Sequence, residues 1–225
     1  IYPLVGLFLA RLAFGYQVLP LLFPLIAGYA LIGPFAAIGL YEMSRQREQG
    51  REISWTDAFA VLRCPSLDAI GALGFVLMVV FVIWLAVALW LYDGLFGSEM
   101  PTSISQFLTE IFTTSRGWTL IIVGHLLGLV FAVVAFTIGV ISFPLLVDRD
   151  VGAVVALQTS VRAVLANPVP MAVWGVIVGA ALAIGSLPFF IGLAVVMPVL
   201  AHATWHIYRK VVERPAGGRP VTSSA

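Results

Sequence analysis

Long apolar stretches alternate with short polar ones along most of this 225-residue chain. A helix needs about 20 mostly apolar residues to cross the hydrocarbon core of a membrane, and several of these stretches reach or approach that length. The pattern therefore predicts about six transmembrane helices. They cover residues 1–19, 20–41, 69–95, 118–146, 168–185 and 188–207.

The polar stretches contain three shorter helical patterns. Residues 104–112 place Ile104, Phe107, Leu108, Ile111 and Phe112 on one face, with Thr102 or Ser103 able to cap the start. This spacing is typical of a helix lying flat on a membrane surface. Two weaker amphipathic segments, near 54–63 and 150–167, predict short interfacial helices on the opposite side. Residues 42–52 between the second and third spans are expected to form a polar loop.

Composition agrees with a membrane environment. The chain is 61% hydrophobic and 10% charged, whereas soluble domains hold about 25% charged residues. The unbroken apolar runs favour an all-α bundle over a barrel, whose strands alternate. We expect one transmembrane domain over residues 1–212 and a flexible cytoplasmic tail over 213–225. The chain begins inside an apolar run without a Met, so we expect the natural amino terminus to lie upstream.

The basic residues are distributed asymmetrically between the predicted loops. Ten of the twelve lie in the segments after the second, fourth and sixth spans, and only Arg11 and Arg116 fall on the other side. Positively charged loops stay in the cytoplasm, so both termini are predicted to be cytoplasmic. The net charge of +1 leaves no basic patch for a nucleic-acid partner. The single Cys64 is placed on the reducing cytoplasmic side.

A pattern of proline followed by polar residues occurs three times. The segments GPFAAIGLYEMSR, SFPLLVDRDV and MPVLAHATWHIYRK carry Pro34, Pro144 and Pro198 in the inner half of a predicted span, before charged or histidine side chains. A short amphipathic helix follows the first two. We interpret the repetition as three related helical hairpins.

These segments, together with SVRAVLANPVPM, resemble the DUF2189 family of proteobacterial integral membrane proteins over nearly the whole chain. The resemblance implies a bacterial inner-membrane protein of about six helices. It brings no activity or catalytic residue that could be transferred to this sequence.

His202 and His206 lie four residues apart, which puts both imidazoles on one face of a helix at a spacing able to hold a metal ion. A third ligand could come from Glu42, Asp148 or Asp150 if the inner helix ends converge. The alternative is that both histidines bond to neighbouring helix ends.

His125 lies about two turns inside the fourth span. A histidine at that depth is expected to face protein, where it could ligate haem, accept a proton or bind a quinone carbonyl. A hydrogen bond between helices is the alternative.

Charged and polar groups on the predicted cytoplasmic side form a further candidate cluster. We expect Asp148, Arg149, Asp150 and Arg162 to pair with one another and Asn167 to cap a helix end; the alternative is a gate or a docking surface. The full candidate cluster is Glu42, Asp148, Arg149, Asp150, Arg162, Asn167, His202 and His206. Small residues in the fourth and fifth spans, namely Gly124, Gly128, Gly175 and Gly179, are expected to allow close helix packing.

The sequence contains no Walker loop, nucleophile elbow, HExxH or CxxC motif, which weighs against an enzyme. We therefore expect a non-enzymatic accessory or assembly subunit that associates with lipid and with a membrane-protein partner. A small-molecule or ion transporter is one alternative, because proline-broken helices occur in carriers. A haem- or quinone-binding redox protein is the other. No cofactor is predicted, although haem or a metal remains open.

Overall fold

The computed structural model describes residues 33–52, 54, 64–97, 103–187 and 191–212. All regular elements in these ranges are helices. They are α3 (Gly33–Glu48), α4 (Leu67–Phe96), α5 (Ile104–Thr113), α6 (Ser115–Gly139), α7 (Ser142–Asp148), α8 (Ala153–Ala166), α9 (Pro168–Ser186) and α10 (Leu193–Val211). The predicted first span, most of the second, the short helix near 54–63 and the tail 213–225 lie outside the described residues.

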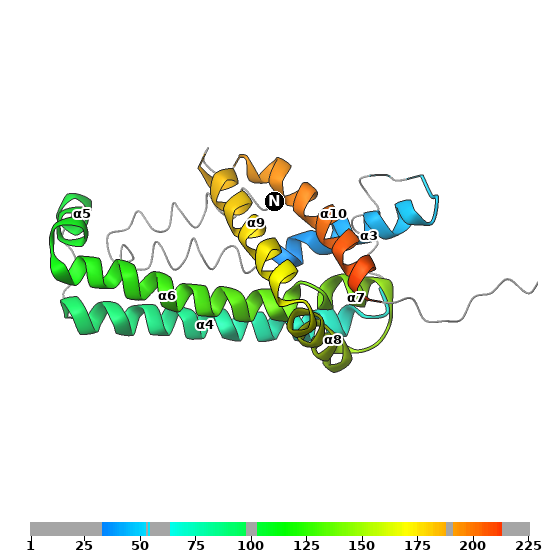
Figure 1. The fold of residues 1–225 in the computed structure, drawn as a ribbon, viewed down its shortest axis with the longest axis horizontal. Coiled ribbons are helices and arrows are strands. Elements are labelled where there is room, and N and C mark those ends of the chain that lie inside the picture. The colour runs from blue at the N-terminus through cyan, green and yellow to red at the C-terminus, as the bar shows by residue number, and fades with distance from the viewer. Residues whose placement is uncertain (1–32, 53, 55–63, 98–102, 188–190, 213–225) are drawn as a thin grey trace, which may run out of the picture.

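The helices form a long antiparallel pair with a second group of helices packed at one end (Figure 1). α4 and α6 lie side by side, and α5 covers the far end of α6. α9 and α10 form a hairpin that rises from the other end, where α3, α7 and α10 contact one another. We call the place where the carboxyl-terminal ends of α3, α7 and α10 meet the three-helix junction.

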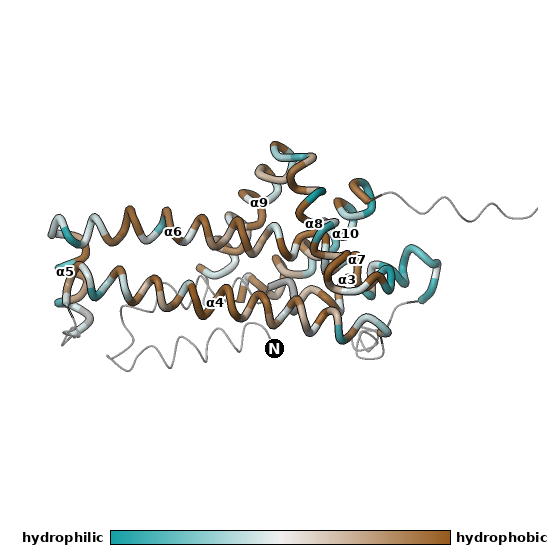
Figure 2. The backbone as a smooth tube through the Cα atoms, turned by 90° about the horizontal axis from the view of Figure 1, so that it is seen from below, coloured by the Kyte–Doolittle hydropathy of each residue, from teal (hydrophilic) through white to brown (hydrophobic). Residues whose placement is uncertain are grey.

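Three segments of the described chain are long and apolar enough to cross a membrane: Leu67–Phe96, Ser115–Asp148 and Pro168–Ser186. Figure 2 shows hydrophobic colouring along most of α4 and α6, with hydrophilic colouring concentrated near the end of α3. At 1.5 Å per residue α4 is about 45 Å long, which exceeds the hydrocarbon core of about 30 Å. The all-α membrane bundle predicted from the sequence is confirmed.

The predicted sixth span corresponds to α10, which has 19 residues but does not reach the same apolarity. Its second half carries four polar residues: His202 and Arg209 bond to neighbouring helices, and His206 and Lys210 are exposed. The polar half marks the end of the apolar region, so α10 extends four residues beyond the predicted boundary.

Helix α3 also continues past its predicted end. Residues 42–48, which we expected in a polar loop, form its last two turns. Glu42 accepts bonds from Arg45 and Gln46, three and four residues later, and these contacts stabilise helical backbone. α3 packs against α10, so the buried Glu42, Ser44 and Gln46 lie between helices instead of in water.

The predicted fourth span is not one straight helix. α6 ends at Gly139, and after two turn residues α7 starts at Ser142. Pro144 has no N–H to donate to Val140, so a continuous helix would lose that bond; within the first turn of α7 the missing N–H costs nothing. The segment from Ile141 to Val147 is buried, so it belongs to the core and not to a lipid-facing surface.

Ser160 of α8 fills the gap that this break opens. Its hydroxyl donates to the carbonyl of Thr137 at 2.6 Å and accepts from the N–H of Ile141 at 3.2 Å. These two backbone groups, four residues apart, would bond to each other in an unbroken helix. The side chain is inserted into the hydrogen-bond ladder and fixes the direction of α7.

Small residues let α8 approach this closely. Ala156, Ser160 and Ala163 recur at helical spacing and are buried against the neighbouring helices. Ser142 adds a second bond by donating to the Ala156 carbonyl at 3.1 Å. α8 is therefore held by polar bonds as well as by contact with the core.

The small residues of α6 and α9 differ in what they face. A side chain at Gly124 would meet Leu91 at 3.9 Å, and one at Gly128 would meet Trp84 at 3.3 Å, so both glycines lie against α4 of the same chain. Gly175 lies against Phe136 of α6, whereas a Cβ at Gly179 would meet no atom within 4 Å. The close approach of α4 and α6 thus depends on Gly128 in particular.

Replacing Ser160 by Ala should destabilise the protein. The change leaves the buried Ile141 N–H and Thr137 carbonyl without the bridging hydroxyl, so we expect the free energy of unfolding to fall by about 1–3 kcal/mol. Chemical denaturation in mild detergent, followed by circular dichroism, measures the difference.

Thr159→Ala is the matched control. Its hydroxyl bonds only within α8, to the Val155 carbonyl, and its removal should change the free energy of unfolding by less than about 0.5 kcal/mol. Equal effects of the two changes would contradict the bridging role of Ser160.

Candidate functional site

The three-helix junction gathers most of the charged side chains that we expected to cluster. Asp148, at the end of α7, accepts hydrogen bonds from the Tyr208 hydroxyl at 2.6 Å, from Arg209 at 3.1 Å and from Arg149 at 3.3 Å. Arg209 also pairs with Glu48 of α3 at 3.1 Å. One guanidinium therefore connects all three helices.

A second group of bonds lies one turn further into α3. The buried Glu42 accepts two bonds from Arg45, both at 2.8 Å, and one from Gln46 at 2.9 Å. Both partners lie on α3 itself, so the negative charge of Glu42 is balanced within its own helix. The hydrogen bond and charge of Glu42 raise the pKa of Arg45 above its ordinary value, against the effect of partial burial.

Burial of Tyr208, assisted by its bond to Asp148, raises the pKa of the phenol above its ordinary value. The phenol therefore stays protonated throughout the physiological pH range and donates its hydrogen bond to the Asp148 carboxylate. The position of Tyr208 follows from the buried face of α10, on which Ala201, Thr204, Trp205 and Tyr208 recur at helical spacing.

Ser44 and His202 connect α3 to α10. The Ser44 hydroxyl lies 2.6 Å from His202 Nδ1 and donates its own proton to the Leu40 carbonyl at 2.8 Å. A hydroxyl has one proton to donate, so the serine accepts from His202, and Nδ1 is the protonated ring nitrogen. His202 therefore bonds to a neighbouring helix, which was the alternative to a metal-binding role.

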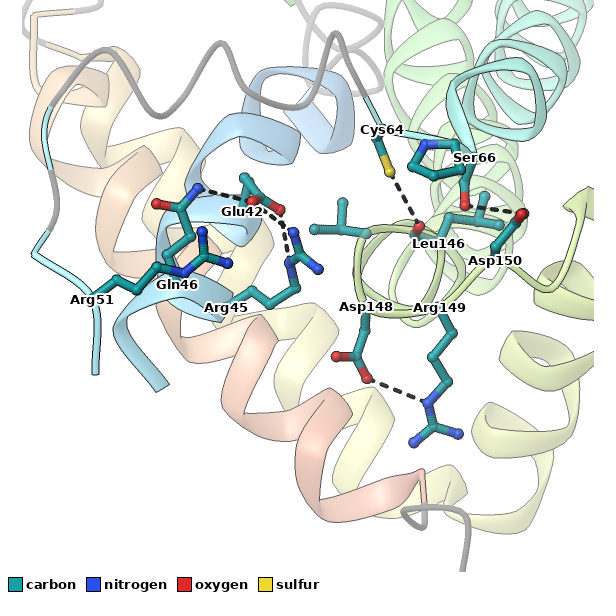
Figure 3. Close-up of a pocket in the computed structure, with 12 residues that line it drawn as sticks. Glu42, Arg45, Gln46, Arg51, Cys64, Ser66, Leu146, Asp148, Arg149 and Asp150 are labelled. Carbon is teal, nitrogen blue, oxygen red and sulfur yellow. Dashed lines mark hydrogen bonds and ion pairs between the residues drawn. The ribbon is translucent and has the colours of Figure 1, made fainter. Parts of the chain in front are cut away.

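A cavity of about 330 Å³ opens beside the junction (Figure 3). Three carboxylates and three guanidinium groups line it: Glu42, Asp148, Asp150, Arg45, Arg51 and Arg149. At its rim the Ser66 hydroxyl lies 3.4 Å from Asp150, and Cys64 Sγ lies 3.9 Å from the Leu146 carbonyl. The three negative and three positive charges balance, so the lining has no net charge that would attract a cation or an anion.

Three predicted cluster members lie elsewhere. Arg162 is exposed on α8, and among the described residues it forms no ion pair. Asn167 donates to the Ala163 carbonyl at 3.0 Å and thereby caps the end of α8. His206 is exposed on α10. The expectation that Arg162 pairs with the Asp148 group is wrong for the described chain, because α8 turns that side chain outward.

His125 lies on an exposed face of α6, with Nδ1 2.7 Å from the Ile121 carbonyl one turn earlier. We expected it to face protein, but in the described chain the residue is exposed. In the same part of the chain no three His, Cys, Asp or Glu side chains are placed to share a metal ion.

Several junction residues were not among the sequence candidates: Ser44, Arg45, Glu48, Tyr208 and Arg209. Arg45 carried a local signal, since it follows Glu42 by three residues. The other contacts join residues far apart in the chain, and no periodicity along one helix indicates them.

A second, larger cavity lies within the apolar part of the molecule. It has a volume of about 690 Å³ and is formed mainly by α6, α9 and α10, with two residues each from α3 (Ala37 and Tyr41) and α8 (Val164 and Leu165). We call it the α9 groove. Nearly all its lining side chains are apolar, and several at its edge are exposed, including Leu129, Val133 and Leu165. Concave, mostly apolar cavities of this size are typical of sites for small apolar molecules.

Apolar spanning helices with one polar junction define an integral membrane protein. The family described as "Predicted integral membrane protein (DUF2189)" matches residues 22–148, more than half of the chain. The protein belongs to this family, as the resemblance suggested. A search of the curated proteins and a search of the solved structures gave no match.

Asp148→Asn should weaken the junction. Losing the charge weakens three hydrogen bonds at a half-buried carboxylate, and we expect the free energy of unfolding to fall by about 1–2 kcal/mol. Denaturant titration in detergent provides the measurement.

Asp150→Asn is the control for charge, because the exposed Asp150 makes only the long contact to Ser66. Its effect should stay below about 0.5 kcal/mol. If both substitutions destabilise the protein equally, the junction does not depend on Asp148.

Proposed function

We propose that this integral membrane protein acts by association, as a non-enzymatic accessory or assembly subunit of a larger complex in the bacterial inner membrane. The observation that carries the proposal is the exposure of α9. This helix is apolar enough to span a membrane, yet only 11% of its spanning window is buried inside the described chain.

The exposed side of α9 is regular. Val169, Val173, Ile177 and Ile184 are between 47% and 71% exposed. At 100° per residue they fall within an arc of about 80°, on the side opposite the α9 groove. We call this set the α9 stripe. Stiff β-branched side chains on one narrow face suit packing against another transmembrane helix, because little rotamer freedom is lost.

The two glycines of α6 that were expected to allow close helix packing, Gly124 and Gly128, do not serve this purpose. Gly124 and Gly128 lie against Leu91 and Trp84 of α4. Their close packing is used within the chain, so the association proposal rests on the α9 stripe and not on these glycines.

The described geometry favours association over the two alternatives. Carriers place uncompensated polar groups at mid-depth, whereas the carboxylates of the junction cavity lie beside arginines and the α9 groove is apolar. Redox binding through His125 would need its ring to face a protein pocket, and the ring lies on an exposed face. Neither alternative has a specific contact in its favour.

The charge distribution supports cytoplasmic termini. Arg45, Arg47, Arg149, Arg209 and Lys210 lie in or directly after the last turns of α3, α7 and α10, which meet at the junction, while Arg116 lies in the first turn of α6, beside α5. The membrane side with more basic residues is the cytoplasmic one. On this basis the junction faces the cytoplasm and α5 the periplasm.

Photo-crosslinking tests the α9 stripe. A photoreactive residue placed at Val173 or at Ile177 in native membranes should give the same discrete protein adduct, because both positions face one partner helix. Immunoblotting with mass spectrometry identifies the adduct.

Val82 of α4 is the control position, since it is 56% exposed and also lies in a spanning helix. It should yield lipid adducts without that protein. Adducts identical at Val82 and Ile177, or lipid adducts alone at every position, would refute the association proposal.

Cysteine labelling tests the orientation. In a Cys64→Ser background, Gln49→Cys and Lys210→Cys should react with a membrane-impermeant maleimide only after the cells are opened. Ser105→Cys on α5 should react in cells whose outer membrane alone is permeabilised. All three positions are exposed. Labelling of Gln49→Cys and Lys210→Cys from opposite sides would overturn the assignment.

A further inference from the structure

We propose that the α9 groove binds one acyl chain of an anionic phospholipid, with its phosphate held at Arg162. The proposal names a ligand site separate from the α9 stripe and does not depend on a protein partner.

The groove has the dimensions and chemistry of a lipid-chain site. It runs along α9 from Pro168 to Leu182, about 21 Å at 1.5 Å per residue, which exceeds the depth of one leaflet, about 15 Å. Its volume of about 690 Å³ lies within the range of small-molecule sites, about 300–1,000 Å³. Among the described residues its apolar edge is exposed, so a chain can enter it from the side.

Arg162 does not line the groove itself, but it supplies a positive charge beside one of the groove residues of α8. It precedes the groove residue Leu165 by three positions on α8, so the two side chains are neighbours on the helix surface. Both are exposed, and no described carboxylate pairs with Arg162. By contrast Arg45, Arg149 and Arg209 all pair with acidic side chains of this chain.

Charge complementarity selects the occupant. An apolar groove alone accepts any lipid chain, but an uncompensated guanidinium beside its end favours a phosphate over a neutral or zwitterionic headgroup. Leu165 of α8 and Pro168 of α9 both line the groove, so a chain lying along α9 can bring its headgroup next to α8, within reach of Arg162 beside Leu165. A phosphatidylglycerol molecule satisfies both requirements.

Native mass spectrometry of the purified full chain tests the proposal. The protein is released from nanodiscs that contain phosphatidylglycerol and phosphatidylcholine with identical acyl chains, and retained lipids are counted. The wild type should prefer phosphatidylglycerol. Arg162→Gln should reduce that preference about fivefold, the factor for one basic side chain at a charged membrane surface.

Lys210→Gln is the matched control. Lys210 is also exposed at the junction end, but it follows the groove residue Ala201 by nine positions and so lies about 180° around α10. Its removal should leave the lipid preference unchanged. An equal loss in both variants would show general surface charge and would overturn the site.

Gly179→Leu tests the other part of the proposal, that the α9 groove binds the acyl chain. A Cβ at Gly179 meets nothing within 4 Å, so the larger side chain can occupy the groove without displacing the backbone. Retention of both lipids should fall at least about fourfold, the factor for one displaced methylene group. Unchanged retention in a variant with the wild-type circular dichroism spectrum would refute groove binding. A photo-crosslink from position 179 to residues 1–32 or to a second copy would assign the groove to protein instead.

Discussion

The arrangement of the core depends on one hydroxyl group placed inside an interrupted helix. Between α6 and α7 the backbone turns away from its path, and Ser160 replaces the bond that Thr137 and Ile141 would otherwise share. Without the Ser160 hydroxyl, the Thr137 carbonyl and the Ile141 N–H would remain unpaired in the core, at a cost of about 1–3 kcal/mol. Because the hydroxyl comes from α8, the break and the position of α8 are determined together. The direction of α7, and with it the location of Asp148, follows from this contact.

The junction shows how a chain with few charges uses them. Asp148, Glu48 and Arg209 come from three helices, and each carboxylate lies beside a guanidinium. Such contacts add little where water screens them, but they gain strength where the side chains are partly buried. They also determine which helix ends meet, since a carboxylate left without its arginine would be costly. The apolar surfaces then face outward, where lipid or another helix can cover them.

The sequence alone predicted the features that depend on the length of an apolar stretch or on neighbouring residues. The observed α4 and α9 begin and end within two residues of the predicted spans, and Ser103 caps α5 by accepting from the Gln106 N–H. The break before α7 was not predicted, because Pro144 in an apolar run is compatible with a kinked but continuous span. The Ser160 bridge and the Tyr208–Asp148 bond join residues 19 to 60 positions apart. Arg162 was placed with Asp148 because both follow the fourth span, but the orientation of α8 separates them.

The shared guanidinium of Arg209 has a mechanical consequence. Sliding α3 past α7 would lengthen one of its two contacts unless α10 moved as well, so these three helix ends behave as a rigid block. The far half of the α4–α6 pair has no such cross-link, and within the described residues only α5 packs on its tip. If the bilayer thins or thickens, that arm can tilt to match it at a modest cost while the block keeps its shape.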